Sequence, residues 1–298
     1  MDEADVQEIL TTRSVTRLRE IDYVVLRDQL PRNLAGDAAF GRVLFAHAHG
    51  RLPGDPSLFN DMLYEMKANG ELYNPLRQFI SDKELGKEFV AARVGREHTV
   101  PTLAVLHTRA AAAAYSFTSE CVVKPTHMSG HVAFVHAGEQ VDWASHEWWW
   151  DINYYLMGRE ANYAHLRPKI IVEPVLFDDP NVGDVKIFCW RGEPRIVQIN
   201  LDRRTDHRIG FFDRDWSPLR FWYTSYPTPD GDVPRPRMLT KALEIAHELS
   251  RDLEFLRVDT YLSDSEVVVG ELTNCPGNAC ERFSPEGGER MASEQLFA

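Results

Sequence analysis

The segment VVKPTHMSGHVAFVHAG, residues 122–138, joins two β-like runs through a short polar loop. Lys124 lies near the end of the first run, and Pro125 ends it because proline cannot donate to a strand ladder. Many strands end on a lysine without further purpose. The loop that follows favours a functional lysine, so both interpretations stay open at this point.

The loop itself has the composition of a phosphate-binding turn. His127, Ser129 and Gly130 belong to a run of small or polar residues around one glycine, where backbone N–H groups can approach an anion closely. The Gly-Lys-Ser signature of a P-loop is missing, so this is a different kind of phosphate site.

The composition limits the classes of protein to which the chain can belong. The chain has 298 residues, 44% hydrophobic and 26% charged, which is typical of a folded protein with one large or two moderate cores. A formal charge of -12 argues against a nucleic-acid-binding face, whereas a nucleotide needs only a local basic pocket. We find no apolar run of about 18 residues and no signal-peptide pattern, so we expect a cytoplasmic protein without a transmembrane segment. Oligomeric state is not readable.

The order of patterns predicts an α+β fold. Helical segments fill about the first 95 residues, and strands with intervening helices follow from Thr99. A clear amphipathic helix, MLTKALEIAHELSRDL, precedes a closing hairpin whose turn contains Asp264 and Ser265. The expected strands are VPTLAVLH, ECVVKP, HVAFVHAG, KIIVEPVLF, DVKIFCW, PRIVQINLD, FLRVDTYLS and EVVVGELTN.

A second group of polar residues lies in a predicted hairpin. With the hairpin loop centred at residues 192–193, we expect Lys186 to face Ile199, and Arg203 to extend the face that carries Asp184. A solvated strand face would look the same.

The closing hairpin carries two acids, Asp259 and Glu271, within apolar strands. Unpaired burial of a carboxylate is costly, so each needs a partner or a cation. Two acids on adjacent strands suit Mg²⁺ held by oxygen ligands and substrate phosphates. Ion pairs with Arg257 and Arg282 are the alternative.

Taken together, this order of motifs resembles the ATP-grasp superfamily, and most closely its TupA-like branch, named for a teichuronopeptide biosynthesis protein. The resemblance covers about residues 50 to 285. The matching stretches are LPGDPSLFNDMLYEMKANGELYNPLRQFISDKELGKEFVAARVG, VVKPTHMSG, KIIVEP, DVKIFCWRGEPRIVQINLDR, FFDRDW, RVDTY and GELTNCPGN.

The resemblance implies an ATP-grasp fold, with a nucleotide cleft between two α+β subdomains and a helical N-terminal part. We expect the helical part at 1–80, the first subdomain with its phosphate loop at 81–175, and the second with the Mg²⁺ and phosphate site at 176–298. ATP and Mg²⁺ are the implied cofactors.

It also implies a nucleotide site. Lys124 would contact phosphate under a closing loop, residues 126–131, that includes His127, Ser129 and Gly130. Lys83 would lie at the entrance of the cleft, and a hinge from Glu173 to about Leu176 would read adenine through its backbone.

The same resemblance assigns the reacting groups. Lys186 and Arg203 would face phosphate and the acyl group, with Asp184 beside Lys186 on the nucleotide side. Arg203 or Arg204 would hold an acylphosphate, because a planar guanidinium grips two oxygens.

Asp259 and Glu271 would hold Mg²⁺, with the third ligand in question. Many ATP-grasp proteins place an asparagine two residues after the glutamate, but here Thr273 takes that place and Asn274 follows. Strand alternation points Asn274 away unless the strand ends or bulges, so Thr273, Asn274 and water all stay open.

The implied reaction is an ADP-forming carboxylate–amine ligation through an acylphosphate, giving an amide or peptide bond. The substrates would be an amino acid and a carboxylated glycan, peptide or natural-product precursor. Two alternatives remain: a kinase acting on a small molecule or glycan, and a nucleotide-binding protein without turnover.

Overall fold

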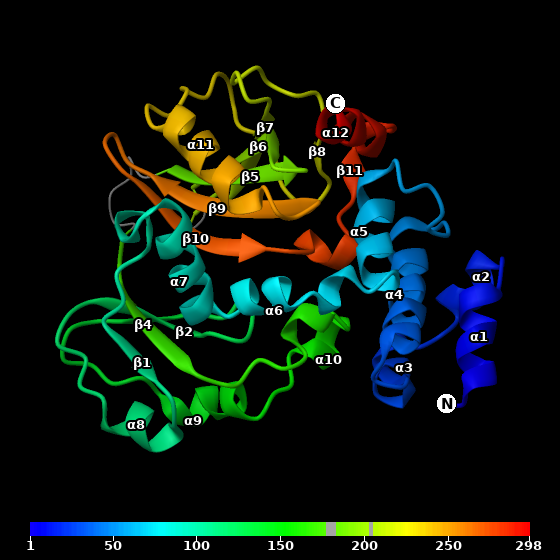
Figure 1. Cartoon of the computed structure of the whole chain (residues 1–298), viewed down its shortest axis with the longest axis horizontal. Helices are drawn as coiled ribbons and strands as arrows, with labels where there is room; N and C mark the ends of the chain where they lie inside the picture. The colour runs from blue at the N-terminus through cyan, green and yellow to red at the C-terminus, as the bar shows by residue number, and fades with distance from the viewer. Residues whose placement is uncertain (177–182, 203–204) are drawn as a thin grey trace.

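The computed structural model describes residues 1–176, 183–202 and 205–298. Its N-terminal helices form a group at one side of the molecule, drawn in blue in Figure 1. Most begin after a residue whose side-chain oxygen accepts from the backbone of the first turn, as Asp2 and Asn33 do. Their bounds are α1 (Glu3–Thr11), α2 (Val15–Arg19), α3 (Tyr23–Gln29), α4 (Leu34–His49) and α5 (Phe59–Ala68).

A four-stranded antiparallel sheet follows, in the order β1-β4-β2-β3. Val123, Ile170 and Val172 are fully buried on it, and Trp149 packs against the same core. The strands are β1 (Ala104–Leu106), β2 (Cys121–Pro125), β3 (Ala133–Val135) and β4 (Ile170–Pro174); the nearby helices are α8 (Arg109–Ala114), α9 (Trp143–His146) and α10 (Tyr155–Gly158).

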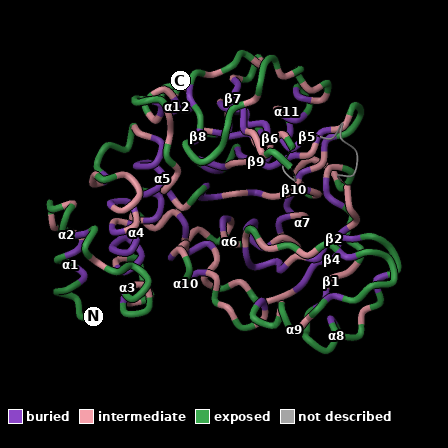
Figure 2. The backbone as a smooth tube through the Cα atoms, turned by 180° about the vertical axis from the view of Figure 1, so that it is seen from behind, coloured by how far each residue is buried: buried purple, intermediate pink, exposed green. Residues whose placement is uncertain are grey.

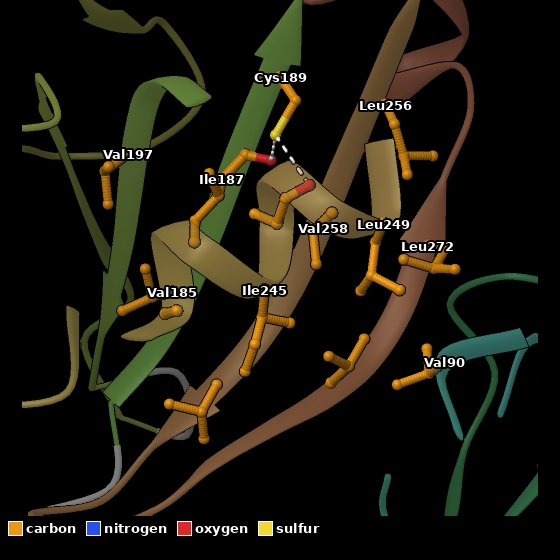
Figure 3. Packing of buried hydrophobic residues seen from close by; sticks show 14 of the residues in the cluster. Val90, Val185, Ile187, Cys189, Val197, Ile245, Leu249, Leu256, Val258 and Leu272 are labelled. Carbon is orange, nitrogen blue, oxygen red and sulfur yellow. Dashed lines mark hydrogen bonds between the residues drawn. The ribbon is translucent and has the colours of Figure 1, made fainter. Parts of the chain in front are cut away.

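The second sheet has five antiparallel strands in the order β10-β9-β5-β6-β7. One face is apolar: Val185, Ile187 and Val258 are fully buried under α11 (Leu239–Ser250), as Figure 3 shows. The strands are β5 (Gly183–Trp190), β6 (Glu193–Leu201), β7 (Arg208–Phe212), β9 (Phe255–Leu262) and β10 (Val267–Thr273).

The register of the β5–β6 hairpin differs from the expected one. Lys186 lies opposite Gln198, not Ile199, and Asp184 lies opposite Asn200. The turn is Arg191 and Gly192, both with positive φ, and a bulge in β6 after that turn adds one residue. The shift puts polar Gln198 and Asn200 beside Lys186 and Asp184.

Two helices lie between the sheets, α6 (Pro75–Ser81) and α7 (Lys83–Val94), and the C-terminal helix α12 (Gly288–Phe297) packs against α5. Figure 2 shows buried residues concentrated along the strands of the two sheets and along α4 and α5. A small two-stranded sheet joins β8 (Trp222–Tyr223) to β11 (Phe283–Ser284). The short 3-10 helices are η1 (Glu71–Tyr73), η2 (Arg96–His98), η3 (Glu147–Trp150), η4 (Ala161–Tyr163) and η5 (Pro276–Ala279).

The architecture is therefore α+β, as the sequence predicts. The aromatic block at residues 146–158, expected to be helix-like, is divided among α9, η3 and α10, with Trp149 buried and Trp148 exposed. Among the described ranges, no helix is both long and apolar enough to span a bilayer.

Arg159, directly after α10, fastens the N-terminal helices to the rest of the chain. Its fully buried guanidinium donates to the carbonyls of Leu30 at 2.7 Å and Pro31 at 3.0 Å, and lies 3.3 Å from Asp37. The hydroxyls of Tyr155 and Tyr73 donate to the same carboxylate. A buried cation is stable here because several backbone carbonyls and a carboxylate accept its hydrogen bonds.

We predict that Arg159→Met lowers the free energy of unfolding by about 3 kcal/mol, because Asp37 and the carbonyls lose their buried partner. Urea unfolding measures the loss. The matched control is Arg109→Met, whose ion pairs with Glu147 and Asp151 are exposed and which should cost less than about 1 kcal/mol. Equal losses in the two variants would contradict the fastening role.

Candidate active site

The polar face of the second sheet brings four predicted residues together. Lys186 on β5 lies directly opposite Asp259 on β9, and Asp259 lies opposite Glu271 on β10. The Lys186 Nζ atom is 2.8 Å from Asp259 Oδ2 and 3.4 Å from Asp184 Oδ1. One cation is therefore shared between two carboxylates, with the third carboxylate on the next strand.

Arg257 is a site residue that the sequence did not single out as functional. It lies two residues before Asp259 on β9, so both side chains share a face. Its Nε is 2.7 Å from Asp259 Oδ1 and its Nη2 is 2.8 Å from Oδ2, while Nη2 also donates to Thr273 Oγ1 at 3.1 Å. The two-residue spacing between Arg257 and Asp259 was the signal in the sequence that could have identified it. The ion pair between these two residues is the alternative to a metal that the sequence left open for Asp259.

These cations keep Asp259 ionised. Burial alone would raise the pKa of its carboxyl, but Arg257 and then Lys186 outweigh burial and hold the pKa below its ordinary value. Burial would lower the pKa of the Arg257 guanidinium, but Asp259, followed by Tyr223 and Glu271, outweighs burial and raises it. The protein thus presents a buried, fully charged carboxylate.

The structure does not bring Asn274 to these carboxylates. The strand β10 ends at Thr273, and the buried Asn274 side chain points to α6, accepting from Arg77 Nη1 at 2.9 Å and donating to Ser81 Oγ at 3.0 Å. Both the oxygen and the nitrogen of its side-chain amide therefore have hydrogen-bond partners on α6. Thr273 instead faces the Asp259 side, next to Arg257.

The first sheet contributes a second charged group. Glu173 on β4 is buried, with Lys124 Nζ 2.7 Å from its Oε2 and Lys87 Nζ 2.5 Å from its Oε1. Burial would raise the pKa of Glu173, yet the two lysines bring it below the ordinary value. Sequence reasoning missed Lys87, although it lies one helical turn after Lys83.

Lys83 bridges the two sheets. It begins α7 directly after the capping Asp82, and its ammonium donates to the Met128 carbonyl in the predicted phosphate loop and lies 3.4 Å from Glu271. A hollow between α7 and β10 is lined by Lys83, Lys87 and Glu271, among others. The predicted phosphate loop and the predicted metal carboxylate therefore meet at one lysine.

The phosphate loop itself is open where its backbone turns. Gly130 is exposed, has φ +79°, and has no atom within 4 Å of the place where a side chain would begin. The adjacent Ser129 is half-buried. A ligand could thus approach this backbone without a steric barrier.

His127 lies buried beneath that loop. Both of its ring nitrogens are without a hydrogen-bond partner in the part of the chain that the structure describes. Burial, followed by the nearby charge of Lys83, lowers the pKa of the imidazole to about 4. It is therefore uncharged at neutral pH, with two unused polar atoms.

Of the remaining predicted residues, the structure describes Leu176. Leu176 is half-buried just beyond Pro174, at the end of β4, where the hinge was expected. Arg203 and Arg204 lie outside the described residues.

The family model of the TupA-like ATP-grasp proteins matches residues 63–296. The chain belongs to this family. The match begins within α5, so the first four helices precede it. None of the curated proteins compared with the chain matches it.

Solved structures with a similar arrangement have low identity. They include D-alanine–D-alanine ligase from Helicobacter pylori, with 15% identity, TM-score 0.38, and 73% of this chain and 61% of that chain covered. D-cycloserine synthetase DcsG has 19% identity, TM-score 0.37, and coverage of 74% and 72%. The ATP-grasp ligase PsnB, solved with its minimal precursor, Mg and ADP, has 11% identity, TM-score 0.34, and coverage of 72% and 58%. The chain thus spans about three fifths of the length of the first and third of these.

ATP and Mg²⁺ are the cofactors of this fold, and the residues fit them. Mg²⁺ is commonly held by one or two carboxylates and completed by phosphate and water oxygens. Asp259 and Glu271 supply two such carboxylates on adjacent strands, and the described residues contain no cluster of three or more His, Cys, Asp or Glu that would make a protein-only metal site. Lys83, Lys124 and Lys186 each place an ammonium group against a carboxylate, so the described residues also contain cations that suit phosphate.

We predict that His127 makes the protein acid-sensitive. Between about pH 6.5 and pH 4 the unfolded chain binds a proton on this imidazole while the folded chain does not, so stability falls as pH falls through that window. The slope is at most about 1.4 kcal/mol per pH unit. Urea unfolding of wild type and His127→Gln at pH 6.5, 5.5 and 4.5 measures it.

The variant should lose less stability on acidification than wild type. The exposed His107 provides the control, because His107→Gln should keep the wild-type slope. Parallel curves for wild type and His127→Gln would show that the buried imidazole is not responsible.

Proposed function

We propose that this protein is an ADP-forming carboxylate–amine ligase. The observation that carries the proposal is the facing arrangement of lysines and ionised carboxylates, joined where Lys83 meets Glu271. Such an arrangement suits phosphoryl transfer, in which catalysis is mostly positioning and charge stabilisation. ATP would phosphorylate a carboxylate, and an amine would displace phosphate to form an amide.

The position of each charged residue in the site suggests its role in the proposed reaction. Lys124 and Lys83 would bind the ATP phosphates beneath the loop at residues 126–131, and Lys186 would contact the phosphoryl group in transfer. Asp259 and Glu271 would hold Mg²⁺, which would neutralise charge on the phosphate oxygens. No side-chain nucleophile is needed for this chemistry.

Arg257 is the second cation that pairs with Asp259, and its position suits binding of the acyl group. Arg257 is a planar guanidinium that already grips a carboxylate with two hydrogen bonds. We propose it as a binder of the acylphosphate, alongside the Arg203 and Arg204 expected from the sequence.

The substrates proposed are an amino acid as the amine and a carboxylated glycan, peptide or natural-product precursor as the acid. We also propose subdomain boundaries near residues 80 and 175. The first lies within α6, three residues before α7 begins at Lys83, and the second directly follows the end of β4 at Pro174.

The reaction is tested by incubating the protein with Mg·ATP, pooled amino acids and a carboxylate fraction of a cell extract, and following nucleotides by mass spectrometry. ADP and phosphate should appear only when both acid and amine are present. Phosphorylated acid or sugar formed without an amine would indicate a kinase. AMP with pyrophosphate, or no nucleotide consumption, would overturn the ligase proposal.

We predict that Lys186→Met lowers turnover at least about 100-fold while the protein remains folded, because a charge aimed at the transferred phosphoryl group is lost. Steady-state ADP release measures turnover, and thermal unfolding checks the fold. Lys241→Met removes an exposed lysine of α11 and should leave turnover unchanged. Wild-type turnover in folded Lys186→Met would remove Lys186 from the site.

A further inference from the structure

Two buried side-chain amides on β6 are only partly hydrogen-bonded. Gln198 and Asn200 lie two residues apart, so their side chains share a face of the sheet, and Gln198 Nε2 donates to Asn200 Oδ1 at 3.0 Å. Gln198 is 3% exposed and Asn200 is 6% exposed. When partners are sought among residues 1–176, 183–202 and 205–298, Gln198 Oε1 and Asn200 Nδ2 have none. Buried polar atoms of this kind are uncommon, because each has given up its hydrogen bonds to water.

The strand register places this pair beside the proposed reacting groups. Gln198 is directly opposite Lys186, and Asn200 is directly opposite Asp184. Residues paired across antiparallel strands lie on one face, and Lys186 is in turn opposite Asp259 on β9. Neighbouring strands are about 4.8 Å apart, so the pair lies one strand from Lys186, on the side away from the carboxylates proposed to hold Mg²⁺. With Mg·ATP at those carboxylates, this is the side on which the acid that receives the phosphoryl group would lie.

The pair is close to the surface on its Asn200 side. The Asn200 Oδ1 atom is 3.1 Å from His207 Nε2, and the His207 ring packs 4.7 Å from that of Tyr226. His207 is half-buried, Tyr226 is 37% exposed, and both lie outside the strands. Towards β7, Phe211 lies opposite Gln198 and belongs to an apolar core. A ligand could therefore reach the pair past two side chains of connecting segments, while the β7 side is closed by packing.

The unpartnered atoms define the group that can bind them. It must donate to Gln198 Oε1 and accept from Asn200 Nδ2, and turning both amides around would only exchange these roles. A carboxylate cannot donate, so it would leave one of the two atoms unsatisfied. A peptide-type amide has one N–H donor and one carbonyl acceptor, and so it matches both.

The distance from Lys186 indicates where this amide lies in the substrate. In an N-acylamino acid or at the end of a peptide, one carbon separates the last amide from the carboxyl group. A carboxyl group beside Lys186 would then place its amide about one strand spacing away, where Gln198 and Asn200 lie.

We propose that Gln198 and Asn200 bind the amide next to the carboxyl group that is activated. The acid substrate is therefore an N-acylamino acid or the C-terminal residue of a peptide, not a sugar acid. This inference rests on the proposed ligase function and selects among its acid substrates. The pair positions the acid and transfers no proton.

The test compares acids that differ in one group. An N-acetylamino acid and the corresponding O-acetyl hydroxy acid have nearly the same shape, but the ester has an oxygen in place of the N–H donor. Wild type receives Mg·ATP, pooled amino acids as amines, and one acid source: pooled N-acetylamino acids, pooled O-acetyl hydroxy acids, pooled uronic acids, or the carboxylate fraction of a cell extract. Mass spectrometry measures ADP and new amide above the level without added acid.

The best N-acetylamino acid and its ester counterpart are then compared in wild type and variants. Wild type should use the amide at least about tenfold faster, because the ester leaves a buried acceptor without a donor. Gln198→Met keeps the length of the side chain without its acceptor, and should reduce the preference to within about threefold. Asn200→Leu should slow amide and ester alike, because both contain the carbonyl. The KM for Mg·ATP should stay constant in both variants.

Three outcomes would overturn the proposal in distinguishable ways. A preference for amide over ester that persists in both variants would leave the pair with a structural role only. Turnover of uronic acids or of the extract, with none of the N-acetylamino acids, would overturn this inference and leave the ligase function supported. Failure to consume ATP with any acid source would refute the ligase function and this inference with it.

A matched control and a folding check complete the experiment. Gln295→Met removes a half-buried glutamine of α12 that donates to the Arg195 carbonyl at 3.0 Å, and it should keep the wild-type preference. Thermal unfolding shows whether each variant is folded. If Gln198→Met does not fold, the wild-type preference for amides over esters and uronic acids decides, and its absence would overturn the proposal.

Discussion

The structure depends on buried carboxylates that are kept ionised by paired cations. Asp259 is bound by Arg257 and Lys186, and Glu173 by Lys124 and Lys87. Burial penalises the charged form of each acid, and in both cases two cations outweigh that penalty and lower the pKa. Because one group lies on each sheet, the charges of the site are in place before a nucleotide binds.

This arrangement explains how one site can receive both Mg²⁺ and a triphosphate. In the proposed site, Mg·ATP would bring a cation for the carboxylates and anions for the lysines, so binding would exchange internal ion pairs for new ones. The contact between Lys83 and Glu271 spans the two groups and would be exchanged in the same way. Preorganised charges of this kind need little rearrangement during reaction, which is what phosphoryl transfer requires.

Much of the fold could be predicted from the sequence because local patterns determine it. The capped helix α7 and the closing hairpin with its turn at residues 264–265 follow from caps, periodicity and turn residues. The β5–β6 register could not be predicted, because the turn lies one residue earlier than expected, at Arg191 and Gly192, and a bulge in β6 adds a residue that has no distinct signal. Asn274 shows the same limit, since its side-chain partners lie on α6, which is distant in the sequence. Arg257 differs, because it lies only two residues from Asp259 on the same strand.

If the carboxylates of the second sheet accept ATP only together with its metal, ATP binding should depend on Mg²⁺. Isothermal titration of the protein with ATP, in Mg²⁺ and then in EDTA, measures this dependence. Affinity should fall at least about tenfold in EDTA, because the triphosphate would meet Asp259 and Glu271 without a bridging cation. Glu271→Gln should reduce this dependence. Equal affinity with and without Mg²⁺, or no ATP binding at all, would show that these carboxylates do not bind the metal together with ATP.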